Sequence, residues 1–177
     1  MKLPPTASQT VGPYWHIGLA WLTIDRLADA DLPGDRVTID GQVIDGDGHS
    51  VTDALIEIWQ ANSAGQYGHP DFLGFGRVPT NAEGRFRFET VKPGLVADPE
   101  GGRQAPHVLV SVFMRGLLKR LVTRIYFPDE PRNADDFVLR RVPAERRATL
   151  VARQVVPGKL QWNVILQGEG ETVFFDC

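Results

Sequence analysis

The segment APHVLVSVF, residues 105–113, places a candidate metal ligand at the start of a predicted strand. Residues two apart on a strand point to the same face, so His107 shares a face with Leu109 and Arg115. A histidine at position 109 would complete a two-histidine metal clamp, but leucine has no donor atom. His107 is therefore either a remnant of a metal site or an ordinary histidine in a strand.

A second candidate, Tyr67, lies in the segment QANSAGQY, directly after another predicted strand. A tyrosine that follows a glycine-containing turn is more often a packing residue than a chemical one. Taken alone, Tyr67 and His107 leave both interpretations open.

Other common site motifs are absent from the sequence. It contains no G-x-x-x-x-G-K-[ST] or G-x-G-x-x-G phosphate motif and no G-x-S-x-G nucleophile motif. The segment DGDGHS, residues 45–50, resembles a calcium loop but has Ser50 in place of the sixth-position glycine and Ile56 in place of the terminal glutamate. A hairpin turn is the better interpretation of that segment.

The composition indicates an ordinary globular protein. The chain has 177 residues and a net charge of −3, with 42% hydrophobic and 23% charged residues, which suits one domain. This charge argues against nucleic-acid or acidic-membrane partners. The single cysteine, Cys177, excludes an internal disulfide, and the absence of an apolar leader or membrane-length segment predicts a cytoplasmic protein.

Short runs with strand propensity recur along the chain, separated by glycine-containing turns. This pattern predicts an all-β fold, an antiparallel β-sandwich that forms a single domain over residues 1–177. Only residues 143–153, PAERRATLVAR, are typical of a helix, with Pro143 in its first turn. The predicted strands cover residues 36–45, 54–62, 85–91, 107–114, 120–127 and 160–168.

Residues 1–35 do not follow the strand pattern and are predicted to form an N-terminal arm. The arm carries Tyr14, Trp15 and Trp21, although chain termini usually fray unless they are held by other contacts. It either folds over its own sandwich or packs against another chain.

Eight segments occur in an order and at a spacing that resemble the intradiol ring-cleavage dioxygenases, over nearly the whole chain. They are SQTVGPY (8–14), GQVIDGDGH (41–49), EIWQANSAGQY (57–67), FGR (75–77), VKPG (91–94), APH (105–107), RIYF (124–127) and QGEGETVFFD (167–176). The resemblance implies the same β-sandwich fold.

In the catalytic members of that family, two tyrosines and two histidines hold iron(III). Tyr67 and His107 match one ligand of each kind, whereas Val96 and Leu109 stand at the other two ligand positions, and Gln104 replaces a family arginine. Iron(III) is a hard ion that favours anionic oxygen donors, and valine and leucine donate nothing. The resemblance therefore implies a degenerate site that holds no metal in this chain, with His107 serving structure.

The resemblance further implies a partner. It suggests a non-catalytic α subunit that pairs with a homologous β subunit, in αβ protomers of a larger oligomer, and the β subunit holds the Fe(III). Such a complex cleaves protocatechuate with O2 to 3-carboxy-cis,cis-muconate, and we expect the arm to pack on the partner. The positions expected to line the partner's substrate site are Thr10, Gly12, Pro13, Tyr14 and Arg115.

Strand geometry separates Arg115 from the four positions of the degenerate metal site, Tyr67, Val96, His107 and Leu109, which we call the vestigial site. Eight residues at about 3.3 Å each place Arg115 up to about 26 Å from His107, so it faces a different site. A guanidinium beside an anionic aromatic acid is a sensible use of arginine. The alternative is a surface arginine that precedes a turn glycine, Gly116.

Two other functions stay open from the sequence. One is a catalytic homo-oligomer, which would need a replacement metal donor. The other is a β-sandwich interaction module without an enzymatic partner.

Overall fold

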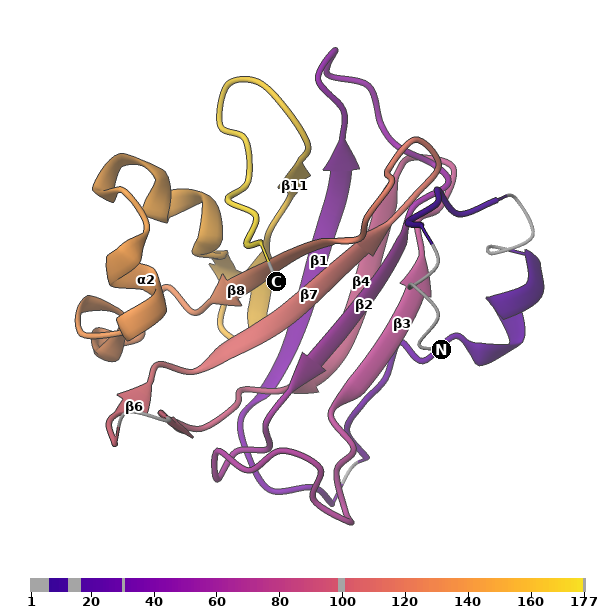
Figure 1. Cartoon of the computed structure of the whole chain (residues 1–177). Helices are drawn as coiled ribbons and strands as arrows, with labels where there is room; N and C mark the ends of the chain where they lie inside the picture. The colour runs from indigo at the N-terminus through magenta and orange to yellow at the C-terminus, as the bar shows by residue number, and fades with distance from the viewer. Residues whose placement is uncertain (1–6, 13–16, 30, 99–100, 177) are drawn as a thin grey trace, which may run out of the picture.

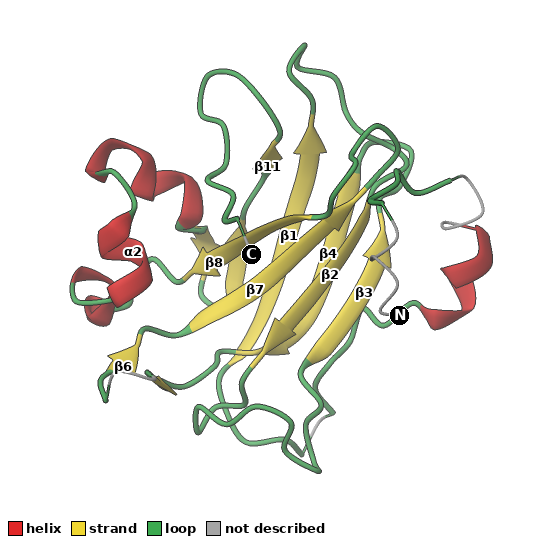
Figure 2. Cartoon of the chain, in the orientation of Figure 1, coloured by secondary structure: helices red, strands yellow, loops and turns green. Residues whose placement is uncertain are grey.

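A computed structural model describes residues 7–12, 17–29, 31–98 and 101–176 of the chain. Two main β-sheets pack face to face, and most of their strands are antiparallel (Figures 1 and 2). The predicted all-β sandwich is therefore confirmed.

The first sheet, called sheet I, has four antiparallel strands in the order β3-β2-β7-β8. These strands are β3 (Phe75–Pro79), β2 (Leu55–Gln60), β7 (His107–Phe113) and β8 (Leu121–Tyr126). A separate hairpin, β5 (Val96–Ala97) with β6 (Arg103–Gln104), extends beside the start of β7.

The second sheet, called sheet II, has five strands in the order β11-β1-β10-β9, with β4 paired to β1. The strand β1 is antiparallel to β4 but parallel to both β10 and β11, and the sequence did not predict these two parallel pairings. The strands are β1 (Arg36–Ile44), β4 (Arg85–Val91), β9 (Arg153–Val156), β10 (Lys159–Gln161) and β11 (Val164–Ile165).

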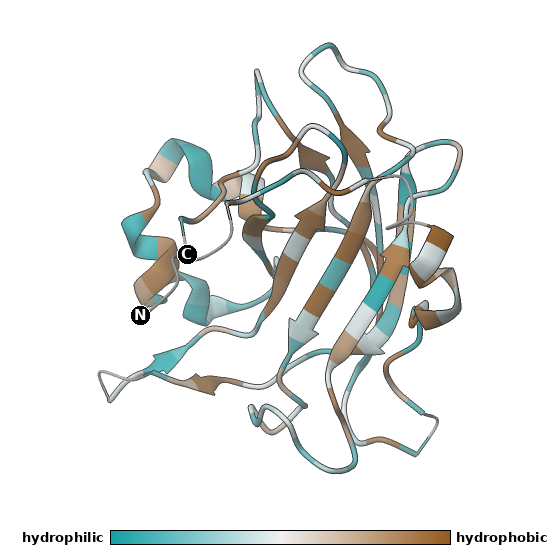
Figure 3. Cartoon of the chain, turned by 45° about the vertical axis from the view of Figure 1, so that its right-hand side comes forward, coloured by the Kyte–Doolittle hydropathy of each residue, from teal (hydrophilic) through white to brown (hydrophobic). Residues whose placement is uncertain are grey.

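Alternation along the strands determines which side chains reach the core and which face outward, and Figure 3 shows it as alternating brown and teal bands. In β7, Val108, Val110 and Val112 are buried between the sheets. His107 and Leu109 therefore point to the outer face of sheet I. That face carries the candidate site.

The helical segments differ in place and type from the predicted helix over 143–153. Ala144–Leu150 (η3) forms a 3₁₀ helix, and Arg153 already begins β9. An α-helix forms instead in the preceding segment, α2 (Phe137–Arg141), whose N-cap Asp136 accepts hydrogen bonds from two backbone N–H groups. It ends before Pro143, because a proline disfavours helical geometry in the residue before it. Two further 3₁₀ helices are η1 (Ala20–Leu22) and η2 (Pro131–Ala134).

Part of the N-terminal arm folds over its own sandwich. Ile24 pairs with Arg77 of β3, and Leu27 donates a backbone hydrogen bond to Glu89 of β4, so this segment joins the two sheets along one side. Trp21 is nevertheless 79% exposed.

Packing of the arm against a partner stays a prediction, and Tyr14 and Trp15 lie outside the described residues. Among the described residues, no helix has the length and hydropathy needed to span a membrane.

Candidate functional site

The turn that positions Tyr67 is built around Asn62. The Asn62 side-chain oxygen accepts hydrogen bonds from the backbone N–H groups of Ala64, at 3.0 Å, and Gln66, at 2.9 Å. Its backbone carbonyl also accepts from Gly94 N–H at 2.9 Å. An asparagine that satisfies its own turn in this way fixes the path of the chain that leads to Tyr67.

Glycine then brings the turn against the segment that carries Val96. Gly65 has φ +79°, and a Cβ atom placed on it would lie 2.0 Å from the Leu95 carbonyl oxygen. No other residue tolerates both the backbone conformation and this contact. The turn before Tyr67 and the segment before Val96 are thus held in contact with each other.

His107 is buried, at 2% exposure, and hydrogen-bonded through both ring nitrogens. Its Nδ1 lies 2.7 Å from the Ala105 carbonyl oxygen, to which it donates, so Nε2 of the neutral ring is the acceptor. The Tyr67 hydroxyl lies 3.4 Å from that Nε2 and is its donor. The two residues that the resemblance expects to remain from a metal site, Tyr67 and His107, therefore contact one another.

A cation lies near Val96 and Leu109, the two positions where the resemblance expects metal ligands to have been lost. Arg124 of β8 is the cross-strand partner of Leu109, and its Nη1 donates to Gln104 Oε1 at 2.8 Å. Gln104 in turn pairs across the small hairpin with Val96. The four vestigial positions are therefore brought together around one guanidinium. Sequence reasoning missed Arg124, because the register that sets it opposite Leu109 is not visible in a single strand.

Burial and this guanidinium determine the charges at the site. Burial, and to a smaller extent the positive charge of Arg124, lower the pKa of His107 to about 4. Burial also raises the pKa of Tyr67, while the positive charge of Arg124 partly opposes that rise. At neutral pH the site therefore holds a neutral histidine, a neutral tyrosine and one permanent cation.

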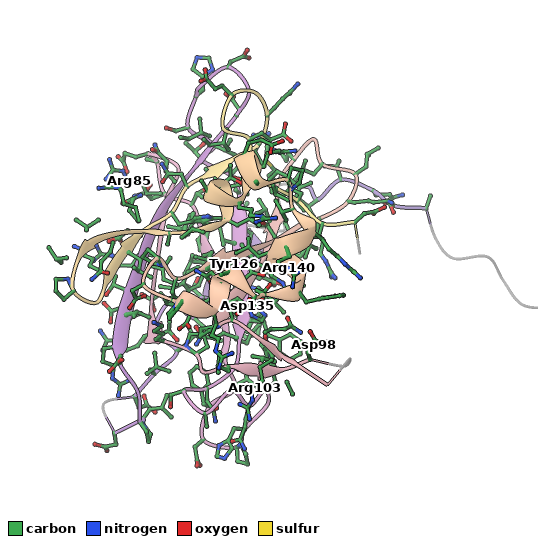
Figure 4. All side chains as sticks on the ribbon, turned by 90° about the vertical axis from the view of Figure 1, so that its left-hand side faces the viewer. Arg85, Asp98, Arg103, Tyr126, Asp135 and Arg140 are labelled. Atoms are coloured by element: carbon green, nitrogen blue, oxygen red, sulfur yellow. The ribbon has the colours of Figure 1, made fainter. Side chains whose placement is uncertain are left out.

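Asp136 connects the site to α2 from a fully buried position. Its Oδ2 accepts from the Ala105 backbone N–H at 2.8 Å, and its Oδ1 accepts from the Tyr126 hydroxyl at 2.9 Å. Burial raises the pKa of Tyr126, so its hydroxyl stays a donor. Figure 4 labels Tyr126 among the helical segments that carry Asp135 and Arg140. One carboxylate thus anchors the segment before His107, the end of β8 and the start of α2.

The expected substrate-lining residues lie at the other end of β7. Arg115 follows the end of β7, whereas His107 begins it, so Arg115 is remote from the vestigial site (Figure 1). Its guanidinium pairs with the Asp53 carboxylate and is 67% exposed. Gly116, with φ +88°, makes the turn, and its N–H donates to Thr10 Oγ1 at 2.9 Å.

The structure therefore places Thr10 against the turn that directly follows Arg115. Gly12 is exposed, and a Cβ atom placed on it would meet no atom within 4 Å. Pro13 and Tyr14 lie outside the described residues. A substrate-binding role for these residues stays a prediction.

An apolar groove of about 430 Å³ crosses the outer face of sheet I next to the vestigial site. Trp59 is 48% exposed there, and its ring centroid lies 4.9 Å from that of Tyr67. Trp59 is also the cross-strand partner of Leu109. The groove lining includes Glu57, Trp59, Phe75, Leu109, Ser111 and Val122.

The segment at residues 45–50 forms a hairpin turn. Asp45 Oδ1 accepts from the backbone N–H groups of Asp47, at 3.0 Å, and His49, at 2.8 Å. One cation could be approached by Asp45, Asp47 and His49. Their hydrogen bonds, however, are those of an ordinary turn.

Comparison with known proteins agrees with this geometry. The family described as "Dioxygenase" matches residues 12–168. The chain is 43% identical to the "Protocatechuate 3,4-dioxygenase alpha chain" of Pseudomonas putida, with 98% of this chain and 97% of that protein covered. The chain belongs to the intradiol ring-cleavage dioxygenases. The corresponding alpha chain of Burkholderia cepacia is 45% identical, with 98% of each chain covered.

Other intradiol dioxygenases match less closely. The "Protocatechuate 3,4-dioxygenase beta chain" of Burkholderia cepacia is 37% identical, over 85% of this chain and 67% of that one. Among solved structures, the dioxygenase domain from Streptomyces sp. SirexAA-E has a TM-score of 0.67 and 28% identity, over 85% of this chain and 89% of that chain. The sandwich is thus the fold of this oxidoreductase family.

Intradiol dioxygenases use non-haem iron, but the vestigial site of this chain does not fit it. Only Tyr67 and His107 retain donor atoms, and they are already hydrogen-bonded to one another. A permanent positive charge, Arg124, lies close enough to affect the pKa of both. A trivalent cation would be repelled by that charge and would gain a single anionic protein donor.

Proposed function

We propose that this chain is the non-catalytic α subunit of a protocatechuate 3,4-dioxygenase, and that it completes the active site of a homologous β subunit that holds Fe(III). The complex would cleave protocatechuate with O2 to 3-carboxy-cis,cis-muconate. One observation carries the proposal. In a family of iron enzymes, this chain has Val96 and Leu109 at the two positions where the resemblance expects metal ligands, and Arg124 lies beside them.

The comparisons support the same assignment. Two relatives named as alpha chains match this chain end to end at 43% and 45% identity, whereas the named beta chain matches at 37% over a smaller share. A two-chain enzyme in which only one chain holds metal accounts for a member that keeps the fold and loses the ligands.

The apolar groove on sheet I supports a protein partner. Trp59 is half-exposed in this groove and is flanked by apolar side chains, and Arg77 and Glu57 form an ion pair beside it. A central tryptophan with polar groups around it is typical of a protein–protein interface. The β subunit is the occupant that the proposal assigns to this face.

The exposed Arg115 and the Thr10 contact support the substrate wall. A guanidinium that is two-thirds exposed can reach beyond its own chain, and Asp53 holds it in place from one side. Its proposed role is to pair with the carboxylate of protocatechuate across the subunit boundary. Thr10 fixes the adjacent Gly116 turn through its hydroxyl.

The test is co-expression with a four-ligand β chain encoded in the same genome, followed by gel filtration and an assay of protocatechuate-dependent O2 uptake. The proposal predicts co-elution and activity only when both chains are present. Trp59→Ala should reduce co-elution, whereas Val155→Ala, which removes an exposed side chain on sheet II, should not. An interaction module without enzymatic function would not restore O2 uptake, and a catalytic homo-oligomer would turn over without the β chain.

A further inference from the structure

The outer face of sheet II carries a second groove, of about 490 Å³, whose lining is polar. Alternation along β1 buries Val37 and Ile39 in the core, so Asp40 and its neighbours point away from sheet I. Figure 4 shows Arg85 beside β1, far from the helices around Arg140. The charged residues of this groove, called the basic groove, are Asp40, Arg85, Arg87, Arg153 and Lys159.

Charge in the basic groove is unbalanced. Asp40 is the single carboxylate among the described residues that line the groove. It accepts two hydrogen bonds from Arg87, at 2.6 and 3.2 Å, and Lys159 Nζ lies 3.9 Å from it. The side chains of Arg85 and Arg153 make no hydrogen bond or ion pair with any residue that the structure describes. Four cations against one carboxylate leave a net charge of +3 in the groove, although the chain as a whole has a net charge of −3.

The cations are spread across the sheet and not gathered at one point. In the backbone register, Arg87 of β4 lies opposite Asp40 of β1, and Asp40 lies opposite Gln161 of β10. Gln161 in turn lies opposite Arg153 of β9, so these residues form one row across four strands. Three strand spacings of about 4.8 Å set the backbones of Arg87 and Arg153 about 14 Å apart, and the backbone of Arg85, two residues along β4 from Arg87, lies about 16 Å from that of Arg153. A ligand with several separated anionic groups matches this spacing better than a single phosphate or a single carboxylate does.

We propose that the basic groove binds a small polycarboxylate, with Arg85 and Arg153 pairing with different carboxylate groups of the same molecule. Two sources supply this chemistry. One is a general metabolic tricarboxylate. The other is the ring-opened tricarboxylate of the proposed reaction, since intradiol cleavage converts both hydroxyl-bearing carbons into carboxylates. The second source rests on the proposed function, whereas the binding chemistry does not.

An NMR titration of the ¹⁵N-labelled full chain at low ionic strength tests the inference, with citrate, 3-carboxy-cis,cis-muconate, benzoate and inorganic phosphate as probes. Both tricarboxylates should shift amide signals of β1, β4 and β10 and bind at least tenfold more tightly than benzoate or phosphate. The tighter of the two tricarboxylates identifies the source. Equal binding of phosphate, or the absence of shifts on sheet II, would overturn the proposal whether or not the chain pairs with a β subunit.

Charge-removing variants give the second readout. Arg85→Gln and Arg153→Gln should each weaken tricarboxylate binding by about fivefold, and the double variant by roughly 25-fold, as expected for exposed charge pairs. Arg132→Gln removes an exposed arginine from η2 and serves as the matched control. A double variant that binds citrate and the muconate as tightly as the unmodified chain would refute the site.

Discussion

The hydroxyl of Tyr67 lies 3.4 Å from Nε2 of His107, so the two residues that match metal-ligand positions of the family are hydrogen-bonded to one another. The His107 ring is oriented from its other side by the Ala105 carbonyl at 2.7 Å. A histidine held in this way is a neutral structural residue. Protonation of His107 is therefore coupled to the stability of the fold.

We expect stability to fall as His107 is protonated. Its pKa is about 4 in the folded chain and close to the ordinary 6.5 in the unfolded chain. Between these pH values the unfolded state binds more protons at His107 than the folded state does. The stabilisation that neutral His107 contributes is therefore complete above pH 6.5 and declines as the pH falls towards 4. The full shift corresponds to about 3 kcal/mol. Urea unfolding at a series of pH values measures it.

His107→Gln provides the comparison, because it cannot titrate while the carboxylate background stays the same. The variant should be less stable at neutral pH and should lose the part of the pH dependence that belongs to this histidine. Parallel stability curves for the two proteins between pH 6.5 and 4 would show that His107 does not contribute.

Asp136 is expected to be one of the most sensitive positions for stability. Asp136→Ala would leave two backbone N–H groups at the start of α2, the Ala105 N–H and the Tyr126 hydroxyl without their acceptor. A loss of about 3 to 5 kcal/mol in unfolding free energy is expected. Tyr126→Phe removes one donor and should cost about 1 kcal/mol.

Asp135 is the matched control for Asp136, because it is the neighbouring residue and is exposed. Asp135→Ala should change stability by less than about 0.5 kcal/mol. Similar losses for the two alanine variants would contradict the assigned network.

The close contact between the Tyr67 turn and the Val96 segment depends on Gly65. Gly65→Ala adds a Cβ atom 2.0 Å from the Leu95 carbonyl oxygen, whereas Gly68→Ala, also at positive φ, meets no atom within 4 Å. Gly68→Ala should cost about 1 to 2 kcal/mol, from backbone strain alone. Gly65→Ala should lower the unfolding free energy by at least about 2 kcal/mol more than Gly68→Ala does. Thermal unfolding of the two variants measures the difference, and equal losses would show that the Tyr67 turn does not contact the Val96 segment.

Arg115 is predicted to select for the substrate carboxylate. In the αβ complex, Arg115→Ala should raise the apparent KM for protocatechuate by about tenfold, the size of one charge-assisted contact. Turnover of catechol, which lacks the carboxylate, should change far less. Steady-state kinetics on both substrates measure the contrast, and an unchanged preference for protocatechuate would remove Arg115 from the site.

Asp53 separates substrate binding from a structural role for the same arginine. Asp53→Asn removes the charge that pairs with Arg115, so the guanidinium is freer to bind an anion and KM should stay equal or fall. If the Arg115–Asp53 pair merely held the loop, both variants would impair both substrates alike.

The sequence predicted the sandwich because its alternating strands carry that information locally. Val108, Val110 and Val112 alternate with His107 and Leu109 along β7 and are buried between the sheets. The pairing partners of a strand are set by contacts distant in sequence, so the parallel alignment of β1 with β10 was not predicted. The α-helix was also misplaced, since its start depends on the buried cap residue Asp136 and not on helix propensity.

The candidate site shows the same division. Tyr67, Val96, His107 and Leu109 were found through family spacing, and the structure brings them together. Arg124 was missed, because only the β7–β8 register places it opposite Leu109. The contact between its guanidinium and Gln104 is a tertiary property, so no single motif could reveal it.

The central claim is that the vestigial site holds a guanidinium network in place of iron. Metal analysis together with visible absorption of the purified chain, alone and with the β subunit, tests it most directly. Because tyrosinate bound to iron(III) absorbs visible light, the account predicts a colourless, iron-free chain alone and a coloured complex with one iron per αβ pair. Stoichiometric iron with a visible tyrosinate band in the isolated chain would contradict it.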